Sequence, residues 1–211
     1  MNEQRPELAQ VYFFNKPGGR NTSKVVEAVK RRYGLGDITK ILVASESGRL
    51  ALELKREIDH GAVVCVTYDE ETRRKYNKPA LMKDELLSKG ITIVDSVPEP
   101  LGRTLSFRNW WESKTVRLPG LSSDLFWMTL ICVGGHGLRT AVEIVFMAVS
   151  AGQVKVGERV VSTAGTGWGA DSAVVMTASS FDDAVGEEPR KRMKIEEVLA
   201  MPKRTEWRGY G

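Results

Sequence analysis

The stretch Ile41-Leu42-Val43-Ala44-Ser45-Glu46-Ser47-Gly48 decides the fold class of this 211-residue chain. Its first four residues are apolar, and the next four form a polar turn that ends in glycine. A short continuous apolar run bounded by turn residues is typical of a strand buried on both faces. A helix is indicated next, with Leu50, Leu52, Leu54 and Ile58 among its apolar positions. The stretch therefore predicts a strand, a turn and a helix, which is the repeating unit of a parallel α/β sheet.

The same alternation extends in both directions along the chain. Strands are predicted at residues 11–14, 41–44, 62–66, 91–94, 159–164 and 173–177, with an edge strand at 195–201. Helices are predicted at about 22–33, 50–58, 81–87, 122–133 and 138–151, the last two separated by the break Gly134-Gly135-His136-Gly137. Residues 69–79 are polar and are predicted to form a loop. Apolar strands that alternate with helices favour a mainly parallel sheet covered on both faces.

Composition limits the class of protein. With 42% hydrophobic and 27% charged residues, the chain is predicted to be a globular protein, and we expect one domain over residues 1–211. Cys65 and Cys132 each lie in an apolar run, so we predict two reduced core residues and no disulfide scaffold. The apolar window at 125–133 is far shorter than the roughly 20 residues that cross a bilayer, and the N-terminus is polar. We therefore expect a soluble, cytoplasmic protein that does not bind a membrane.

Three segments lack a clear periodicity. Residues 95–120 contain Pro and Gly with several basic and aromatic side chains, and we interpret this insert as a lid, an oligomer contact or a hairpin. Residues 181–194 are predicted to be a mobile charged loop, and residues 203–211 a basic tail. With a net charge of only +4, a solvated charged surface explains these basic residues better than nucleic-acid binding. Homo-oligomer formation stays open.

The turn from Ser45 to Gly48 is the first candidate phosphate site. The first amides of the following helix have no partner inside the helix, and the helix dipole favours an anion there. Ser45 and Ser47 add hydroxyl groups, and Gly48 would allow a phosphate close to the backbone. The alternative is a simple capping turn with Ser45 as the cap.

Two further turns follow predicted strands. Gly165-Thr166-Gly167-Trp168-Gly169, followed by Asp171, could surround a phosphate or lie against a planar ring, although its spacing matches neither a dinucleotide-binding fingerprint nor a P-loop. Asn15 and Lys16 precede Pro17-Gly18, where Lys16 could meet an anion. The alternative for both is a structural turn.

His136 and Glu143 are the candidate catalytic residues. His136 lies among glycines at the helix break and has a pKa suited to proton transfer. Glu143 lies one helical turn after Arg139 in an apolar setting, so a structural ion pair is the alternative. We expect no metal site, because the sequence contains no ligand set with metal-binding spacing. The sequence also lacks a Gly-x-Ser-x-Gly element.

The order of several motifs resembles one family, the stand-alone archaeal and bacterial proteins related to the pyruvate kinase C-terminal domain. The resemblance extends from about residue 11 to residue 202. It rests on Tyr12-Phe13-Phe14-Asn15-Lys16-Pro17-Gly18, Asn21-Thr22, Val43-Ala44-Ser45-Glu46-Ser47-Gly48, Gly135-His136-Gly137-Leu138, Val142-Glu143-Ile144 and Gly169-Ala170-Asp171-Ser172-Ala173-Val174-Val175.

The resemblance implies a three-layer α/β/α fold with a mixed, mostly parallel sheet. In pyruvate kinases a Ser-Gly-Arg-Ser-type loop of this domain holds a phosphate of a sugar bisphosphate effector, and a later glycine-rich loop closes over it. Ser47-Gly48-Arg49 is similar to the first loop, with Leu50 in place of the second serine, and Gly165–Gly169 is similar to the second. Stand-alone relatives are associated with flavin mononucleotide (FMN).

We therefore expect a phosphorylated small molecule, FMN, at the carboxyl ends of the strands. The residues predicted to bind it are Asn15, Lys16, Ser45, Ser47, Gly48, Thr67, Tyr68, His136, Gly165, Thr166, Gly167 and Asp171. The alternative is a non-catalytic regulatory or sensor module for a sugar phosphate or a nucleotide.

The sequence departs from the family at two places and from pyruvate kinase as a whole. Relatives tend to have basic residues where this chain has Thr166 and Trp168, and the segment Arg108–Arg117 is unlike the family pattern. The chain contains no catalytic barrel, so we expect no pyruvate kinase activity, and enzymatic activity of any kind stays open.

Overall fold

The fold was analysed in a computed structural model, which describes residues 9–95, 117–118, 121–184 and 186–203. The strands are β1 (Tyr12–Phe14), β2 (Lys40–Ala44), β3 (Val63–Val66), β4 (Thr92–Val94), β5 (Arg117–Leu118), β6 (Leu121–Ser122), β7 (Arg159–Ala164), β8 (Ser172–Thr177) and β9 (Lys194–Pro202). The helices are a 3-10 turn η1 (Gly19–Asn21), α1 (Thr22–Tyr33), α2 (Arg49–Glu57), α3 (Glu70–Lys75), α4 (Lys83–Ser88) and α6 (Ser123–Ser150).

Within these residues, the main sheet has seven strands in the order β1-β9-β8-β7-β2-β3-β4. All neighbouring pairs are parallel except those made by β8, which is antiparallel to both β7 and β9. The predicted mostly parallel α/β sheet is thus confirmed. The prediction of β9 as an edge strand is wrong, because β1 pairs with its outer side from Tyr12↔Ala200 to Phe14↔Pro202.

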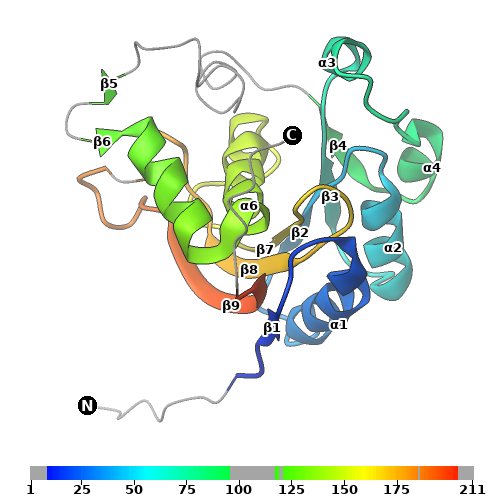
Figure 1. The fold of residues 1–211 in the computed structure, drawn as a ribbon, viewed down its shortest axis with the longest axis horizontal. Coiled ribbons are helices and arrows are strands. Elements are labelled where there is room, and N and C mark those ends of the chain that lie inside the picture. Colours follow the sequence, from blue (N-terminus) through cyan, green and yellow to red (C-terminus); the bar gives the residue numbers. More distant parts are fainter. Residues whose placement is uncertain (1–8, 96–116, 119–120, 185, 204–211) are drawn as a thin grey trace.

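Helices cover both faces of the sheet, as Figure 1 shows for α1 and α2 on one side and α6 on the other. In β2, Ile41 and Val43 belong to the core under α1 and α2, whereas Leu42 belongs to the core under α6. Side chains alternate across a strand, so a continuous apolar run supplies both cores at once. The strand at the start of this stretch is apolar throughout because Ile41, Leu42 and Val43 are each buried in one core or the other.

Helix α6 bends at Gly135, whose φ of 78° and ψ of −172° lie outside the helical region. A left-handed φ is accessible to glycine at little cost, which explains the glycine at the break. The segment Phe126–Ser150 is long and apolar enough to cross a membrane, but 67% of its most apolar window is buried inside the structure. This burial is expected for the core helix of a soluble protein.

The two cysteines differ in their surroundings. Cys65 in β3 is fully buried, as predicted. Cys132 is exposed, so the prediction of a core residue is wrong for it. The reason is that α6 turns Cys132 and Val133 outward while Leu130 and Ile131 pack inward. A continuous apolar run in a helix covers every side of the helix, including the exposed one.

Helix α3 replaces part of the predicted loop at residues 69–79. Asp69 caps it, because its carboxylate accepts a hydrogen bond from Thr72 N at 2.7 Å. Acidic residues follow in the first turn and basic residues in the last, as the helix dipole favours. The helix is polar on nearly every side, so it lacks the apolar periodicity from which the other helices were predicted.

Most of the insert at 95–120 and of the basic tail at 203–211 lies outside the described residues, and so does the segment Arg108–Arg117 apart from its last residue. The charged segment 181–194 forms turns, with Met193 N bonded to Ala184 O at 3.2 Å. Phe181 packs against Phe126, Trp127 and Phe146 of α6. The mobility of this segment stays a prediction.

Candidate ligand-binding site

The predicted site residues lie along one edge of the sheet, where the parallel strands end and β8 begins. We call this the carboxyl edge. Ala164, the last residue of β7, pairs with Ser172, the first residue of β8, and Val43↔Thr163 brings the ends of β2 and β7 into register. Neighbouring strands lie about 4.8 Å apart, so the ends of β8 and β3 are separated by about 14 Å. The turns after β2, β3 and β7 therefore lie within the span of one small molecule.

Asp171 connects three parts of this edge. Its side chain is fully buried, and Oδ2 accepts hydrogen bonds from Gly18 N at 2.8 Å and from Thr166 N at 3.0 Å. Its Oδ1 accepts a hydrogen bond from Ser172 Oγ at 2.9 Å. Oδ1 also lies against Gly137, because an added Cβ there would collide with it. Gly137 begins the second half of α6, where the helix dipole favours a negative charge.

Because its oxygens are used by the protein, Asp171 acts as a positioning residue. Its carboxylate fixes the turn after β1 and the turn after β7 against α6. Contact of Asp171 with a ligand stays a prediction.

The glycine turn after β7 is closely packed on one side and open on the other. An added Cβ at Gly165 would meet the backbone of Gly169, and one at Gly169 would meet Thr22 and Gly19. In contrast, an added Cβ at Gly167 or at Gly18 would meet nothing within 4 Å. These two open positions allow a ligand to approach the backbone closely.

Trp168, which was not among the predicted ligand contacts, is a further candidate for the site. Its indole ring lies directly over Gly19, where an added Cβ would overlap the ring, and yet the residue is 75% exposed. An exposed tryptophan of this kind is uncommon on a protein surface, which makes it a candidate contact for a planar ligand. The signal in the sequence was a large aromatic residue between two glycines.

In the turn after β2, the prediction of Ser45 as the helix cap is wrong, because Gly48 is the N-cap residue of α2 and no side chain caps this helix. Ser45 Oγ accepts a hydrogen bond from Gly48 N at 3.1 Å, and Ser47 Oγ lies 3.5 Å from Arg49 N. Gly48 has a φ of 89°, and an added Cβ would lie 2.8 Å from Leu86 Cδ1. The turn thus requires glycine for its backbone and for packing, whether or not a phosphate approaches it.

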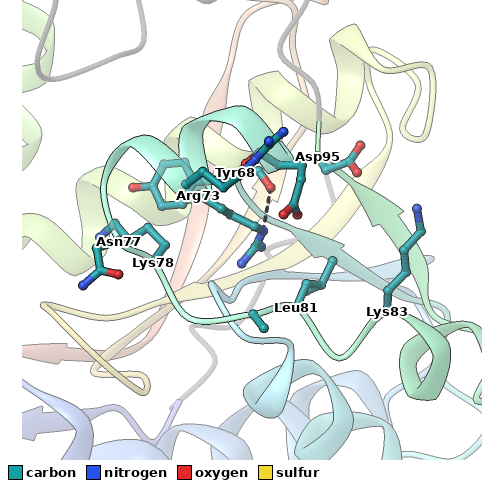
Figure 2. A pocket seen from close by; sticks show the side chains of 10 residues that line it. Tyr68, Arg73, Asn77, Lys78, Leu81, Lys83 and Asp95 are labelled. Atoms are coloured by element: carbon teal, nitrogen blue, oxygen red, sulfur yellow. Dashed lines mark hydrogen bonds between the residues drawn. The ribbon is translucent and has the colours of Figure 1, made fainter.

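Arg73 organises the turn after β3, and the sequence analysis missed it because it lay in a predicted loop. This residue is 4% exposed, and its guanidinium donates hydrogen bonds to the carbonyl oxygens of Glu46, Tyr68 and Pro79 and to Thr67 Oγ1. Thr67 Oγ1 also donates to Glu46 O at 3.4 Å, so this predicted ligand contact is already engaged within the protein. Tyr68 is 43% exposed, and its ring lies 5.4 Å from Lys78 Nζ (Figure 2).

The proposed catalytic pair lies on α6. The Arg139–Glu143 ion pair is confirmed, with Nη1 2.9 Å from Oε2 and Nη2 3.0 Å from Oε1. Burial raises the pKa of Glu143 to about 7, although the Arg139 guanidinium acts to lower it. The guanidinium carbon lies 5.1 Å from the centroid of Trp127. His136 is partly buried, and burial lowers its pKa, with Arg139 acting in the same direction and Asp171 opposing it.

The structure groups the predicted residues into two sets. The first set surrounds Asp171 and contains the turns after β1 and β7, with His136 at the bend of α6. Asn15 and Lys16 are exposed in this set, and Lys16 O accepts a hydrogen bond from Asn21 Nδ2 at 2.9 Å. The second set surrounds Arg73 and contains the turns after β2 and β3. Neighbouring strands β7 and β2 join the two sets at the carboxyl edge.

A comparison of the sequence with models of known protein families finds no match. Among the residues described in the structure, no group of three or more His, Cys, Asp or Glu side chains could hold a metal ion. The function therefore has to be inferred from the carboxyl edge itself.

Proposed function

We propose that the protein binds FMN across the carboxyl edge and belongs with the stand-alone relatives of the pyruvate kinase C-terminal domain. The observation that carries the proposal is the junction at Asp171, which joins two glycine-containing turns at the same edge of the sheet as the turn from β2 to α2. In open α/β sheets, ligands bind beyond the carboxyl ends of the strands, where connections diverge. The chain from β2 continues to α2 on one face, whereas β7 returns directly into β8.

The phosphate would bind at the turn from Ser45 to Gly48. This turn precedes α2, a helix of nine residues with no acidic residue in its first turn. The helix dipole and the hydroxyl groups of Ser45 and Ser47 favour a phosphate there. Arg49 is exposed at the same end and adds positive charge.

The flavin ring would lie toward the second glycine turn. The open faces of Gly18 and Gly167 admit a flat ring against the backbone, and the exposed Trp168 offers a surface for stacking. Tyr68 and Thr67, two strands away from β7, would border the ribityl chain. The donor groups and the open glycine positions both fit a phosphorylated planar molecule.

A bound flavin would supply redox chemistry, and the protein would bind and orient it. His136 is the candidate for holding or moving a proton, because its lowered pKa favours the neutral imidazole at pH 7. Glu143 is engaged with Arg139 and would position that guanidinium. We infer no pyruvate kinase activity and a cytoplasmic location.

A second candidate is a regulatory or sensor module for a sugar phosphate or a nucleotide. The Arg139–Glu143 ion pair favours it, because the pairing engages one of the two candidate catalytic groups. Such a module would use the Ser45–Gly48 turn for phosphate in the same way. The ligand of such a module would need no planar ring over Gly167.

A titration with FMN, riboflavin, fructose 1,6-bisphosphate and AMP distinguishes these candidates. The proposal predicts that FMN binds at least tenfold more tightly than riboflavin, since only FMN has the phosphate, and more tightly than the sugar bisphosphate and AMP. Tighter binding of the sugar bisphosphate or of AMP would favour the sensor module. Equal affinity for riboflavin and FMN would contradict the proposed phosphate site.

A further inference from the structure

A pocket beside the proposed flavin site has a chemistry of its own. It has a volume of about 550 Å³ and lies between α3, the segment that leads to α4, and the end of β4 (Figure 2). Its lining residues are Tyr68, Glu70, Arg73, Arg74, Asn77, Lys78, Ala80, Leu81, Lys83 and Asp95. We call it the α3 pocket, and we propose that it binds the phosphate group of a second small molecule.

The charges around the α3 pocket favour an anion. Four lining residues are basic and two are acidic, and one of the basic residues, Lys78, is paired with Glu46 outside the lining, which leaves an excess of one positive charge. Low-dielectric walls strengthen the field of such charges inside a concave surface. The basic lining residues come from different elements: Arg73 and Arg74 belong to α3, whereas Lys83 belongs to α4 and is labelled in Figure 2.

The surroundings of Arg73 give the strongest support for an anion in the α3 pocket. Its buried guanidinium donates hydrogen bonds to three carbonyl oxygens and one hydroxyl group. Those acceptors are all neutral, and within the described parts of the chain no carboxylate forms an ion pair with Arg73. A buried charge usually has a counter-ion, so a site next to Arg73 favours a bound anion.

Four donated bonds also hold the guanidinium in place. Arg73 has five N–H groups, and four of them donate to Glu46, Pro79, Thr67 and Tyr68, which leaves one N–H on Nη2 with no acceptor among the described residues. A fixed guanidinium loses little conformational entropy when it binds phosphate. Arg73 is therefore a preorganised cation at the wall of the pocket.

Tyr68 lies between the α3 pocket and the carboxyl edge. Burial raises the pKa of Tyr68, and Glu46, Lys78, Arg139 and Glu143 all act on it. Lys78 bonds to Glu46 Oε1 at 2.7 Å and so connects the pocket to the turn after β2. A phosphorylated molecule in the pocket would thus lie next to the ligand of the carboxyl edge. The inference goes beyond FMN binding, since the pocket needs no flavin to attract phosphate.

Inorganic phosphate is the probe for this site. The amides of Arg74, Asn77 and Lys78 would be followed by NMR during a phosphate titration, with and without saturating FMN, and with sodium chloride at matched ionic strength as a control. We expect saturable shifts at these amides in phosphate only. The double variant Arg74→Ala/Lys83→Ala should weaken binding at least fivefold.

The matched control is Arg56→Ala/Lys89→Ala, which removes the same charge from exposed positions outside the pocket. This control should change the affinity for phosphate less than twofold. Equal weakening by both double variants, or no saturable shift at the pocket amides, would overturn the inference. Competitive displacement of FMN by phosphate bound at these amides would also overturn it, because the two sites would then be one.

The same samples separate this inference from the proposed function. Failure of FMN to bind, with phosphate still bound at the α3 pocket, would contradict only the flavin proposal. FMN binding without a phosphate response at the pocket would contradict only the second site.

Discussion

The carboxylate of Asp171 accepts a hydrogen bond from the backbone amide of Gly18, 153 residues earlier in the chain, at 2.8 Å. The same oxygen accepts the amide of Thr166. One buried side chain therefore sets the relative positions of the first turn of the sheet and the glycine turn after β7. Hydrogen bonds to charged groups contribute about 1.5–3 kcal/mol each, so this arrangement is stable enough to preorganise a site.

Replacing Asp171 should therefore loosen both turns. In Asp171→Asn the amide oxygen can still accept from Gly18 N and Thr166 N while the NH2 group faces Ser172 Oγ, but the negative charge that strengthens these hydrogen bonds is lost. We expect a loss of about 1–3 kcal/mol in the free energy of unfolding. Hydrogen exchange at the amides of Gly18 and Thr166 should become faster.

Asp182→Asn is the control, because Asp182 is exposed. Urea denaturation and hydrogen exchange measure both variants. Unchanged exchange at Gly18 and Thr166 in Asp171→Asn would show that the carboxylate does not hold these turns.

Gly137 is expected to be intolerant of any side chain. An added Cβ would collide with Asp171 Oδ1 and would lie close to Ser172 Oγ. Gly137→Ala should therefore destabilise the protein by about 1–3 kcal/mol, as overpacking of a core does. In Gly34→Ala, where φ is −62° and the nearest atom would lie 3.4 Å from the Cβ, stability should be equal or slightly higher. Thermal unfolding compares the two, and equal stability would mean that α6 does not pack against Asp171 this closely.

Glu143 should make stability depend on pH. Its pKa is raised to about 7 from an ordinary value of 4.5. Between these two values the folded protein keeps a proton that the unfolded chain has released, so this group lowers stability as pH rises. The lowered pKa of His136 makes stability rise with pH, which opposes the effect of Glu143. The difference in the free energy of unfolding between a Glu143 variant and the parent isolates the effect of Glu143.

The free energy of unfolding of Glu143→Gln, minus that of the parent, should therefore be larger at pH 8 than at pH 5. Urea denaturation at both pH values gives this difference, and Glu71→Gln, at an exposed position, provides the control. A difference that is the same at pH 5 and pH 8 would contradict the raised pKa.

Trp168 should contribute to flavin affinity without contributing to stability. Stacking of a planar base on an aromatic side chain is worth about 1–3 kcal/mol, so Trp168→Leu should weaken FMN binding by about 5- to 150-fold. Leu35→Ala, which shortens another exposed apolar side chain, is the control. Quenching of flavin fluorescence measures both affinities. If Trp168→Leu binds FMN as tightly as the parent does, the ring lies elsewhere.

The strands, and the edge of the sheet at which the candidate turns meet, could be predicted from the sequence because both depend on local patterns. Apolar runs such as Val63–Val66 indicate buried strands, and parallel strands bring their carboxyl ends to one edge. The order of the strands could not be predicted in the same way. Strand β9 is polar on part of its surface, as an edge strand would be, but Arg32 and Arg159 bind Glu197 there and allow it to lie inside the sheet.

The contacts that build the site depend on distant parts of the chain. Asp171 and Gly18 have no pattern that connects them, and Arg73 lay in a segment without apolar periodicity. A buried cation that is held by carbonyl oxygens cannot be recognised from the composition of the chain or from the spacing of its residues. The sequence therefore indicated where the candidate turns lie, whereas the contacts that connect them required the structure.

Amide chemical-shift mapping with FMN tests the central claim most directly. The account predicts saturable shifts at residues 15–18, 45–48 and 165–167, which lie at the carboxyl edge, with little change at Thr39 and Gly61 at the opposite edge. Saturable binding with shifts confined to the opposite edge, or no saturable binding of FMN, would contradict the account.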